Sequence, residues 1–287
     1  MSSASTGVMS RWGRGFAMVP LGVQLAVLWI IVCIVMIIAL PLLSNLSVTA
    51  IDLQARLAPP VGLGGAWAHP LGTDDLGRDV LARLVASLRT SLAIALGAVV
   101  ISASLGTLIG IIAAHVGGWI DQLIVAAVDA QISVPFIIIS LTLTAIFGNN
   151  LVLFIAILGL FGWERYTRLA RAMTMASRGR GYVLAMSTLG FSWPRIYLRH
   201  VLPNIASTLL VTATITFPEV ILLEASLSFL GLGIQPPMTS LGNMLGFGRS
   251  YLLTGWWIAV APGLTIFLCA LAVSVVGDWV RNLIGRT

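Results

Sequence analysis

Three aspartates stand close together in the segment GTDDLGRD, where clustered carboxylates could bind a metal ion. Asp74, Asp75 and Asp79 lack the alternating spacing and the terminal glutamate of a calcium-binding EF-hand loop. Three arginines follow at positions 78, 83 and 89. We therefore interpret Thr73 or Asp74 as the N-cap of a helix that carries these arginines, and we expect no metal site.

Three more carboxylates fall inside long apolar stretches of the chain: Asp129, Glu219 and Glu224. A charged side chain at the centre of a membrane costs about 2.5–3.5 kcal/mol on insertion scales, so it usually faces a watery cavity or a partner. These residues are candidates for lining a translocation path, and the alternative is that they form internal hydrogen bonds between helices. Pro135 and Pro218 each remove a backbone hydrogen bond and can kink their helices beside such a path.

Motifs for enzymatic chemistry are absent from the sequence. There is no phosphate-binding GxxxxGKS/T loop, no HExxH and no GxSxG. The histidines are scattered at positions 69, 115 and 200, and the cysteines, Cys33 and Cys269, lie in separate apolar runs without CxxC spacing. We expect no catalytic residue and no cofactor in this chain, and we interpret both cysteines as small buried side chains.

The composition places the chain in a membrane. Of its 287 residues, 58% are hydrophobic and only 9% are charged, and the mean hydropathy is +1.01. Soluble domains carry about 25% charged residues, and a core in water could not absorb so much apolar surface. All sixteen basic residues are arginine, and we assign the net charge of +6 to cytoplasmic loops instead of nucleic-acid binding.

Six apolar segments have the length, or nearly the length, of a helix that crosses a bilayer. They are Leu21–Leu43, Ser91–Ala114, Leu123–Phe147, Leu151–Trp163, Ile205–Leu232 and Trp256–Val280. The fold class is therefore an all-α polytopic membrane protein. The predicted organisation is a tail over residues 1–20, a first span over 21–43, an irregular excursion over 44–90, a core of spans over 91–280 and a tail over 281–287.

The arginines predict the orientation in the membrane, because cytoplasmic loops carry the excess of positive charge. With the N-terminus in the cytoplasm, eleven of the sixteen arginines lie inside, and the five outside are offset by nearby aspartates. An even number of spans then places both termini in the cytoplasm.

The basic stretch Glu164–Pro203 is predicted to be a cytoplasmic loop that docks on a soluble protein. It holds seven arginines and one glutamate, a formal charge of +6. Helically spaced apolar residues form its docking element, with flanking aromatic contacts: Tyr182, Leu184, Ala185, Met186, Leu189, Phe191 and Trp193. Gly190 would end this helix, Ser192 would cap a second short helix, and Leu202-Pro203 would close the unit. The alternative is an amphipathic helix that lies on anionic lipid.

Residues Arg178–Asn204, RGRGYVLAMSTLGFSWPRIYLRHVLPN, resemble the EAA loop of ABC-importer permeases. In that family the loop carries a Glu-Ala-Ala triplet, a glycine after three further residues, and an ending in Leu-Pro. Here Leu184-Ala185-Met186 stands at the triplet, Gly190 at the glycine and Leu202-Pro203 at the ending. Because Leu184 replaces the family's glutamate, we expect docking to rely on apolar contacts and neighbouring arginines.

Two further segments narrow the resemblance to permeases of the dipeptide/oligopeptide/nickel class. Leu71–Leu92, LGTDDLGRDVLARLVASLRTSL, looks like that class's segment ahead of the second span. Glu224–Met244, EASLSFLGLGIQPPMTSLGNM, looks like its signature after the fifth span. The likeness runs from about Pro70 to Gly285 and is specific to the C-type member of a two-permease system.

The resemblance implies a type I ABC-importer permease fold with six transmembrane helices, in the inner membrane of a bacterium. It implies half of a translocation pathway, with a B-type permease as the other half, two ATPase subunits that bind ATP and Mg²⁺, and an extracytoplasmic substrate-binding protein. Dipeptides or oligopeptides are the expected substrates, and nickel chelates are the alternative within the class. A self-contained channel or secondary transporter is the alternative of a different class, although no inverted repeat is evident in the sequence.

Overall fold

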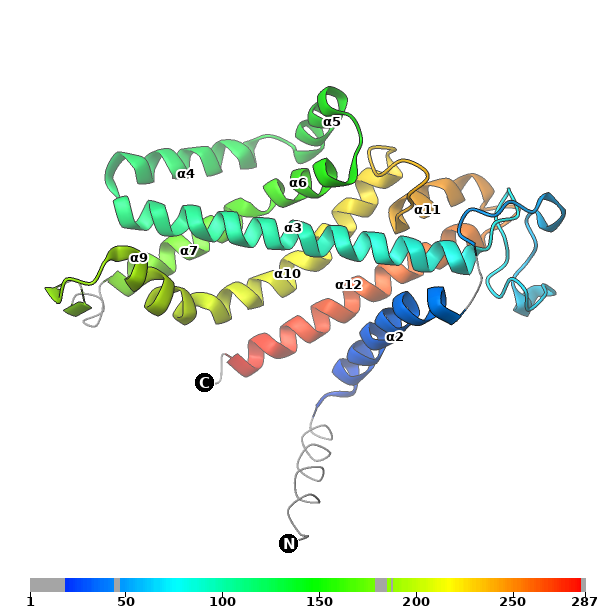
Figure 1. Cartoon of the computed structure of the whole chain (residues 1–287), viewed down its shortest axis with the longest axis horizontal. Helices are drawn as coiled ribbons and strands as arrows, with labels where there is room; N and C mark the ends of the chain where they lie inside the picture. The colour runs from blue at the N-terminus through cyan, green and yellow to red at the C-terminus, as the bar shows by residue number, and fades with distance from the viewer. Residues whose placement is uncertain (1–18, 44–46, 179–184, 187, 285–287) are drawn as a thin grey trace, which may run out of the picture.

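The computed structural model describes residues 19–43, 47–178, 185–186 and 188–284, and the regular structure in these residues is helical (Figure 1). The α-helices are α2 (Leu21–Leu43), α3 (Val80–Val116), α4 (Gly118–Ser133), α5 (Phe136–Phe147), α6 (Leu151–Phe161), α7 (Trp163–Arg178), α9 (Trp193–Ile196), α10 (Leu202–Phe229), α11 (Leu241–Gly248) and α12 (Trp257–Ile284). Single turns are η1 (Leu53–Ala55), η2 (Val61–Leu63), η3 (Tyr197–Val201) and η4 (Arg249–Tyr251). This confirms the predicted all-α class.

Four of the described helices are long and apolar enough to cross a membrane, and they confirm four of the six expected spans. They are Leu21–Leu42, Val80–Val116, Trp193–Phe229 and Trp257–Leu283. A fifth span arises only if α4 and α5, which meet at 90°, are taken together. Helix α6 has 11 residues and is about 17 Å long, too short to span by itself, so the total of six remains a prediction.

Helix α3 is the longest element, with 37 residues, and other helices pack around it. It contacts α2, α6, α7 and α10 along its length, and α4 runs back beside it after a turn at Gly117-Gly118 (Figure 1). Both glycines have positive φ, 67° and 57°, which glycine adopts without strain. The segment 47–79 and α11 lie at the end of the molecule where α3 begins, and α9 lies at the opposite end (Figure 1).

The start of α3 differs from the predicted start. Its cap is Asp79, whose side chain accepts a hydrogen bond at 2.8 Å from the amide of the third helical residue. Asp74 instead accepts hydrogen bonds from Arg78 and Arg83, and the hydroxyl of Thr73 donates to the carbonyl of residue 55. The capping prediction for Thr73 or Asp74 is therefore wrong, because both side chains fold the preceding segment onto itself. The irregular excursion ends at Asp79, well before Thr90.

Pro135 separates α4 from α5, as the sequence predicts for the third apolar segment. Val134 has an extended backbone (φ −97°, ψ 126°), the conformation that a following proline favours. Because proline also lacks the N–H that would continue the helix, α4 ends at Ser133 and α5 starts in a new direction at Phe136. The third segment is therefore two short helices and not one straight span.

The basic stretch Glu164–Pro203 is not one loop, because α7 takes up its first fifteen residues and packs on α3. Leu202-Pro203, predicted to close the unit and lead into the next span, does mark the start of α10, but without the expected break, since the helix runs on from Trp193 to Phe229. The π-helical turn η3 leads directly into α10, with Pro203 in the first turn of α10.

Helices α2 and α12 are neighbours that run in opposite directions, so the start of α2 and the end of α12 lie at the same end of the bundle (Figure 1). Cys33 of α2 and Cys269 of α12 are buried in the core, and their Sγ atoms are 3.9 Å apart. Both are free thiols. The prediction of small buried side chains is confirmed, while the contact between them could not be read from their separation of 236 positions.

Candidate functional site

The segment that resembles the EAA loop bends at Gly190. Its φ is +79°, and no atom would contact a Cβ placed there. The Phe191 amide donates to the Met186 carbonyl at 3.2 Å, and the Leu189 amide donates to the Ala185 carbonyl at 3.0 Å. This backbone pattern ends a helix on a left-handed glycine and confirms Gly190 as the predicted stop. Tyr182 and Leu184 lie outside the described residues.

A small apolar core holds the segment after this bend. Ile196, Tyr197, Val201 and Ile205 are all at most 5% exposed and pack against Ala170 of α7. The partly buried side chains around them come from α3, α7, the loop itself and the start of α10: Ile111, Met173, Met186, Leu202 and Leu209. We call the described residues 185–186 and 188–201 the coupling segment. Since it shares this core with α7, the two should move together.

Aromatic and polar contacts also join the coupling segment to the end of α3. The rings of Trp193 and His115 are 4.9 Å apart, and Trp193 stacks on Tyr197 at 6.0 Å. His115 Nδ1 lies 3.2 Å from the Tyr197 hydroxyl, and Arg178 at the end of α7 donates to the Ala114 carbonyl at 2.5 Å. His115, which the sequence left without a role, therefore belongs to the base of the coupling segment.

Several apolar side chains of the coupling segment are exposed in the part of the chain that the structure describes. Leu189 is 75% exposed, and Phe191 and Trp193 are about two-fifths exposed at 40% and 38%. The structure adds Leu198, which is 64% exposed and which sequence reasoning missed because it falls in the turn before α10. Ser192 stands at the predicted N-cap of α9, but its side chain makes no capping hydrogen bond there.

Two ion pairs join α7 to α4 and α10. Arg165 Nη1 lies 2.8 Å from Glu219 Oε2 of α10, and Arg168 Nη2 lies 2.6 Å from Asp129 Oδ1 of α4. All four side chains are between 45% and 59% exposed. We call these four residues the charged face. The structure thus brings together two of the carboxylates that the sequence proposed for a translocation path.

A third pair continues the same row. Arg171 makes two hydrogen bonds of 2.5 Å to Asp121 of α4 and is less exposed than the charged face. These three arginines of α7, at positions 165, 168 and 171, recur at every third residue, so neighbouring ones lie on the same side of the helix. The acidic partners of these arginines lie in apolar parts of the sequence. Sequence analysis therefore identified the arginines as a basic stretch but could not identify their ion pairs.

The other path candidates lie elsewhere. Glu224 is fully buried and accepts hydrogen bonds from Ser91 at 2.9 Å and Ser228 at 2.7 Å. Such a network favours the alternative interpretation for Glu224, hydrogen bonding that joins α3, α10 and α11. Pro218 is buried in α10, and Pro135 is exposed at the start of α5.

The aspartates of the GTDDLGRD segment are occupied by protein partners. Asp79 Oδ2 lies 2.8 Å from His69 Nδ1, and Asp74 binds two arginines. Tyr251 donates a hydrogen bond of 2.9 Å to Asp75, which raises the pKa of Tyr251. Within the described ranges, no three His, Cys, Asp or Glu side chains are grouped as a metal site would require.

Curated relatives resemble this chain over most of its length. The di/tripeptide transport system permease protein DppC of Pseudomonas aeruginosa is 39% identical over 79% of this chain and 75% of its own. A putative peptide permease protein of Brucella suis is 36% identical over 97% of this chain and 91% of its own. The probable D,D-dipeptide transport system permease protein DdpC of Escherichia coli is 34% identical over 92% of this chain and 87% of its own.

A solved structure shares the fold. The MetNI methionine ABC transporter, in an inward-facing conformation, matches with a TM-score of 0.55 over 70% of this chain and 96% of the matched chain, at 21% identity. The family described as the binding-protein-dependent transport system inner membrane component matches residues 106–287. With this match and with relatives above 30% identity along most of the sequence, the chain belongs to the binding-protein-dependent transport system inner membrane component family.

Proposed function

We propose that this chain is the permease subunit of an ATP-driven importer of dipeptides or oligopeptides in a bacterial inner membrane. The proposal rests on the family and on relatives whose names describe peptide permeases. The family is a transport component and not a catalytic subunit. ATP and Mg²⁺ bind to two partner ATPase subunits, a second homologous permease completes the pathway, and an extracytoplasmic binding protein delivers the substrate.

The observation that carries this function is the coupling segment. Its outer side presents Leu189, Phe191, Trp193 and Leu198 to a partner, and its inner side is packed on α7. An exposed apolar patch on a rigid base is what a docked helix needs in order to transmit movement without deforming. When the ATPases close on ATP, the coupling segment and α7 move as one body and reorient the spans.

The charged face supports a position for the translocation path. Exposed charges are costly against lipid, so Arg165, Arg168, Asp129 and Glu219 need either water or a protein partner in front of them. A water-filled path between this chain and the second permease meets that need. Asp129 and Glu219 then line the path. Pro135 and Pro218 lie near these two carboxylates in the sequence, and the buried Glu224 stabilises α10 through its hydrogen bonds.

The orientation follows from the arginines and from the antiparallel arrangement of α2 and α12. The coupling segment is cytoplasmic because it meets ATPases, and the end of α3 that contacts it is then the cytoplasmic end. In this proposal both termini are cytoplasmic and the segment 47–79 faces the binding protein. Helices α4–α5 and α6 would add two membrane segments to the four helices that are long and apolar enough to cross by themselves.

Substitution of Gly190 by valine tests the coupling role. A left-handed conformation costs a residue with a Cβ about 1–2 kcal/mol, so the bend shifts and the docked patch is displaced. We expect uptake of a labelled dipeptide into vesicles, and substrate-stimulated ATP hydrolysis, to fall about five- to thirtyfold. Both are measured on the reconstituted complex purified through a tag on this chain, with a nickel chelate as the parallel substrate.

The matched control is Gly64→Val. Gly64 has a φ of +94° and equally empty surroundings, but lies in the segment at the opposite end of the molecule. We expect normal coupling in this variant. Normal substrate-stimulated ATP hydrolysis in Gly190→Val would contradict the coupling role. If the wild-type chain purifies without ATPase subunits, the proposal of an ATP-driven importer is wrong.

Substitution of Glu219 by glutamine tests the charged face. The change removes an exposed ion pair with Arg165, so we expect the stability of the complex to fall by no more than about 1 kcal/mol. Uptake should nevertheless change severalfold, because the electrostatic field along the path changes. Asp278→Asn, an exposed carboxylate paired with Arg281 on α12, is the control. If Glu219→Gln and Pro218→Ala both transport normally, this face does not line the path.

A further inference from the structure

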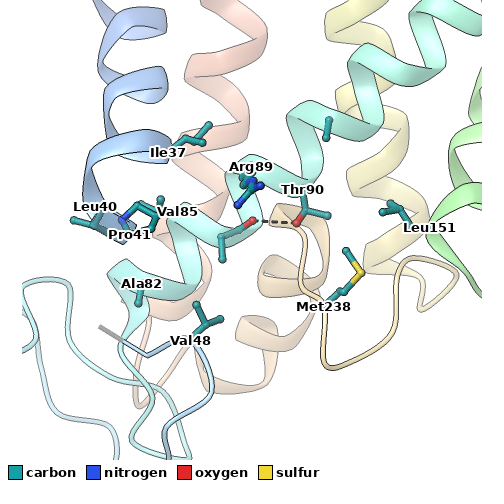
Figure 2. Close-up of a pocket in the computed structure, with 12 residues that line it drawn as sticks. Ile37, Leu40, Pro41, Val48, Ala82, Val85, Arg89, Thr90, Leu151 and Met238 are labelled. Atoms are coloured by element: carbon teal, nitrogen blue, oxygen red, sulfur yellow. Dashed lines mark hydrogen bonds between the residues drawn. The ribbon is translucent and has the colours of Figure 1, made fainter. Parts of the chain in front are cut away.

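A cavity of about 480 Å³ lies between the last turns of α2 and the first turns of α3, away from the coupling segment and the charged face (Figure 2). Its walls are mostly apolar and include Ile37, Leu40, Pro41, Val85 and Ala86. One charged side chain, Arg89 of α3, lines the same cavity. Figure 2 shows Arg89 in the space between α2 and Thr90.

Arg89 differs from the other arginines near the start of α3. Arg78 and Arg83 both bind Asp74, whereas no described residue forms a hydrogen bond or ion pair with Arg89. The side chain is exposed at the cavity. A guanidinium carries five donors in a planar fork that matches phosphate oxygens, so an unpaired one beside an apolar cavity fits an anion that is attached to an apolar body.

The position of Arg89 along the helices corresponds to the membrane surface. The cavity residues of α2 lie in the last two turns of its apolar stretch, which ends at Leu43. From Thr90 to Ala114, helix α3 has no charged residue, so Arg89 is the last charge before its apolar part. Arg89 therefore lies at the level where lipid headgroups meet the acyl chains, and the cavity residues of α3 extend to both sides of it, from Ala82 to Ala93.

We propose that this cavity is a binding site for an anionic phospholipid, whose phosphodiester binds Arg89 and whose acyl chain lies in the cavity. The volume suits a ligand of this kind. A partner protein's helix is the alternative occupant. Such a helix is about 10 Å wide and rises 5.4 Å per turn, so roughly one turn would fill the cavity, which is too little for a helix–helix interface. The bound lipid fills the space between α2 and α3, and so links α2 to the rest of the bundle.

Native mass spectrometry of the delipidated complex tests the site, with palmitoyl-oleoyl phosphatidylglycerol as the probe. We expect one retained lipid per copy of this chain. Arg89→Gln should weaken its affinity about fivefold or more, the effect of one arginine at an anionic surface. Ala93→Phe should weaken binding similarly with Arg89 intact, because Ala93 is an exposed cavity residue whose enlargement fills the space. Arg56→Gln, an exposed arginine outside the cavity, should bind the lipid normally.

Three results would overturn the proposal. Unchanged lipid affinity in both cavity variants would show that lipid binds elsewhere. Equal competition by glycerol phosphate, which has no acyl chain, would reduce the site to an anion contact. Loss of the second permease from the Arg89→Gln complex, with lipid binding unchanged, would show that the cavity is a protein interface.

Discussion

Replacement of Asp74 by alanine is expected to lower the stability of the folded chain by about 3–5 kcal/mol, the cost of breaking a buried ion pair from one side. Asp74 is fully buried and binds Arg78 at 2.7 Å together with Arg83. It also accepts hydrogen bonds of 2.9 Å from the amides of Leu76 and Arg78. Without the carboxylate, the buried Arg83 and both amides lose their acceptor.

Thermal unfolding of the purified protein in detergent measures this effect, and loss of folded material during purification would be its extreme form. Asp278→Ala removes a carboxylate of the same type from an exposed pair, so we expect a change of less than about 1 kcal/mol. If the Asp74→Ala and Asp278→Ala proteins melt at the same temperature, the buried network around Asp74 does not hold the segment 47–79 together.

Replacement of Gly106 by alanine is expected to force α3 away from α7, at a cost of about 3 kcal/mol or more. A Cβ at Gly106 would lie 2.3 Å from the carbonyl oxygen of Trp163 and 2.7 Å from the Cβ of Tyr166. Both atoms belong to the body of α7 and cannot rotate away. The hydrogen bond of 3.1 Å from Thr167 to the Gly106 carbonyl would be lost with the separation.

Gly110, one turn further along α3, has the same surroundings. Its Cβ would lie 2.5 Å from the Thr167 carbonyl oxygen, so Gly110→Ala should behave like Gly106→Ala. This pair is the close-approach motif of membrane helices, in which small residues four apart let backbones touch. Because α7 carries the coupling segment, we expect transport to fall further than the loss of folded protein explains.

Gly263→Ala in α12 is the control for both substitutions. Its Cβ would meet only Leu245 Cδ1 at 3.4 Å, an ordinary contact. Since alanine favours helix more than glycine, this variant should melt at the same or a higher temperature. Opposite changes in melting temperature would separate steric conflict from helix propensity. A Gly106→Ala protein as stable as the wild type would mean that α3 and α7 are not in close contact.

The sequence was sufficient for features that depend on local or bulk properties. Hydropathy decides that lipid is the solvent, and a run of twenty apolar residues forms a helix there because every backbone group must be satisfied. Gly190 and Pro135 were also predictable, since each acts on the backbone at its own position. Local reasoning also placed the start of α10 at Leu202-Pro203, but it did not predict that the π-helical turn would run into α10 without a break.

Only the tertiary structure decided which charges are paired. Arg165 and Glu219 are 54 positions apart, and Arg168 and Asp129 are 39 apart, so nothing in their local sequence links them. The same holds for Asp74, whose neighbours predicted a helix cap while its burial made it the acceptor for two arginines. Burial and pairing depend on how helices pack across long separations, whereas span, turn and charge excess depend on residues close together in the chain.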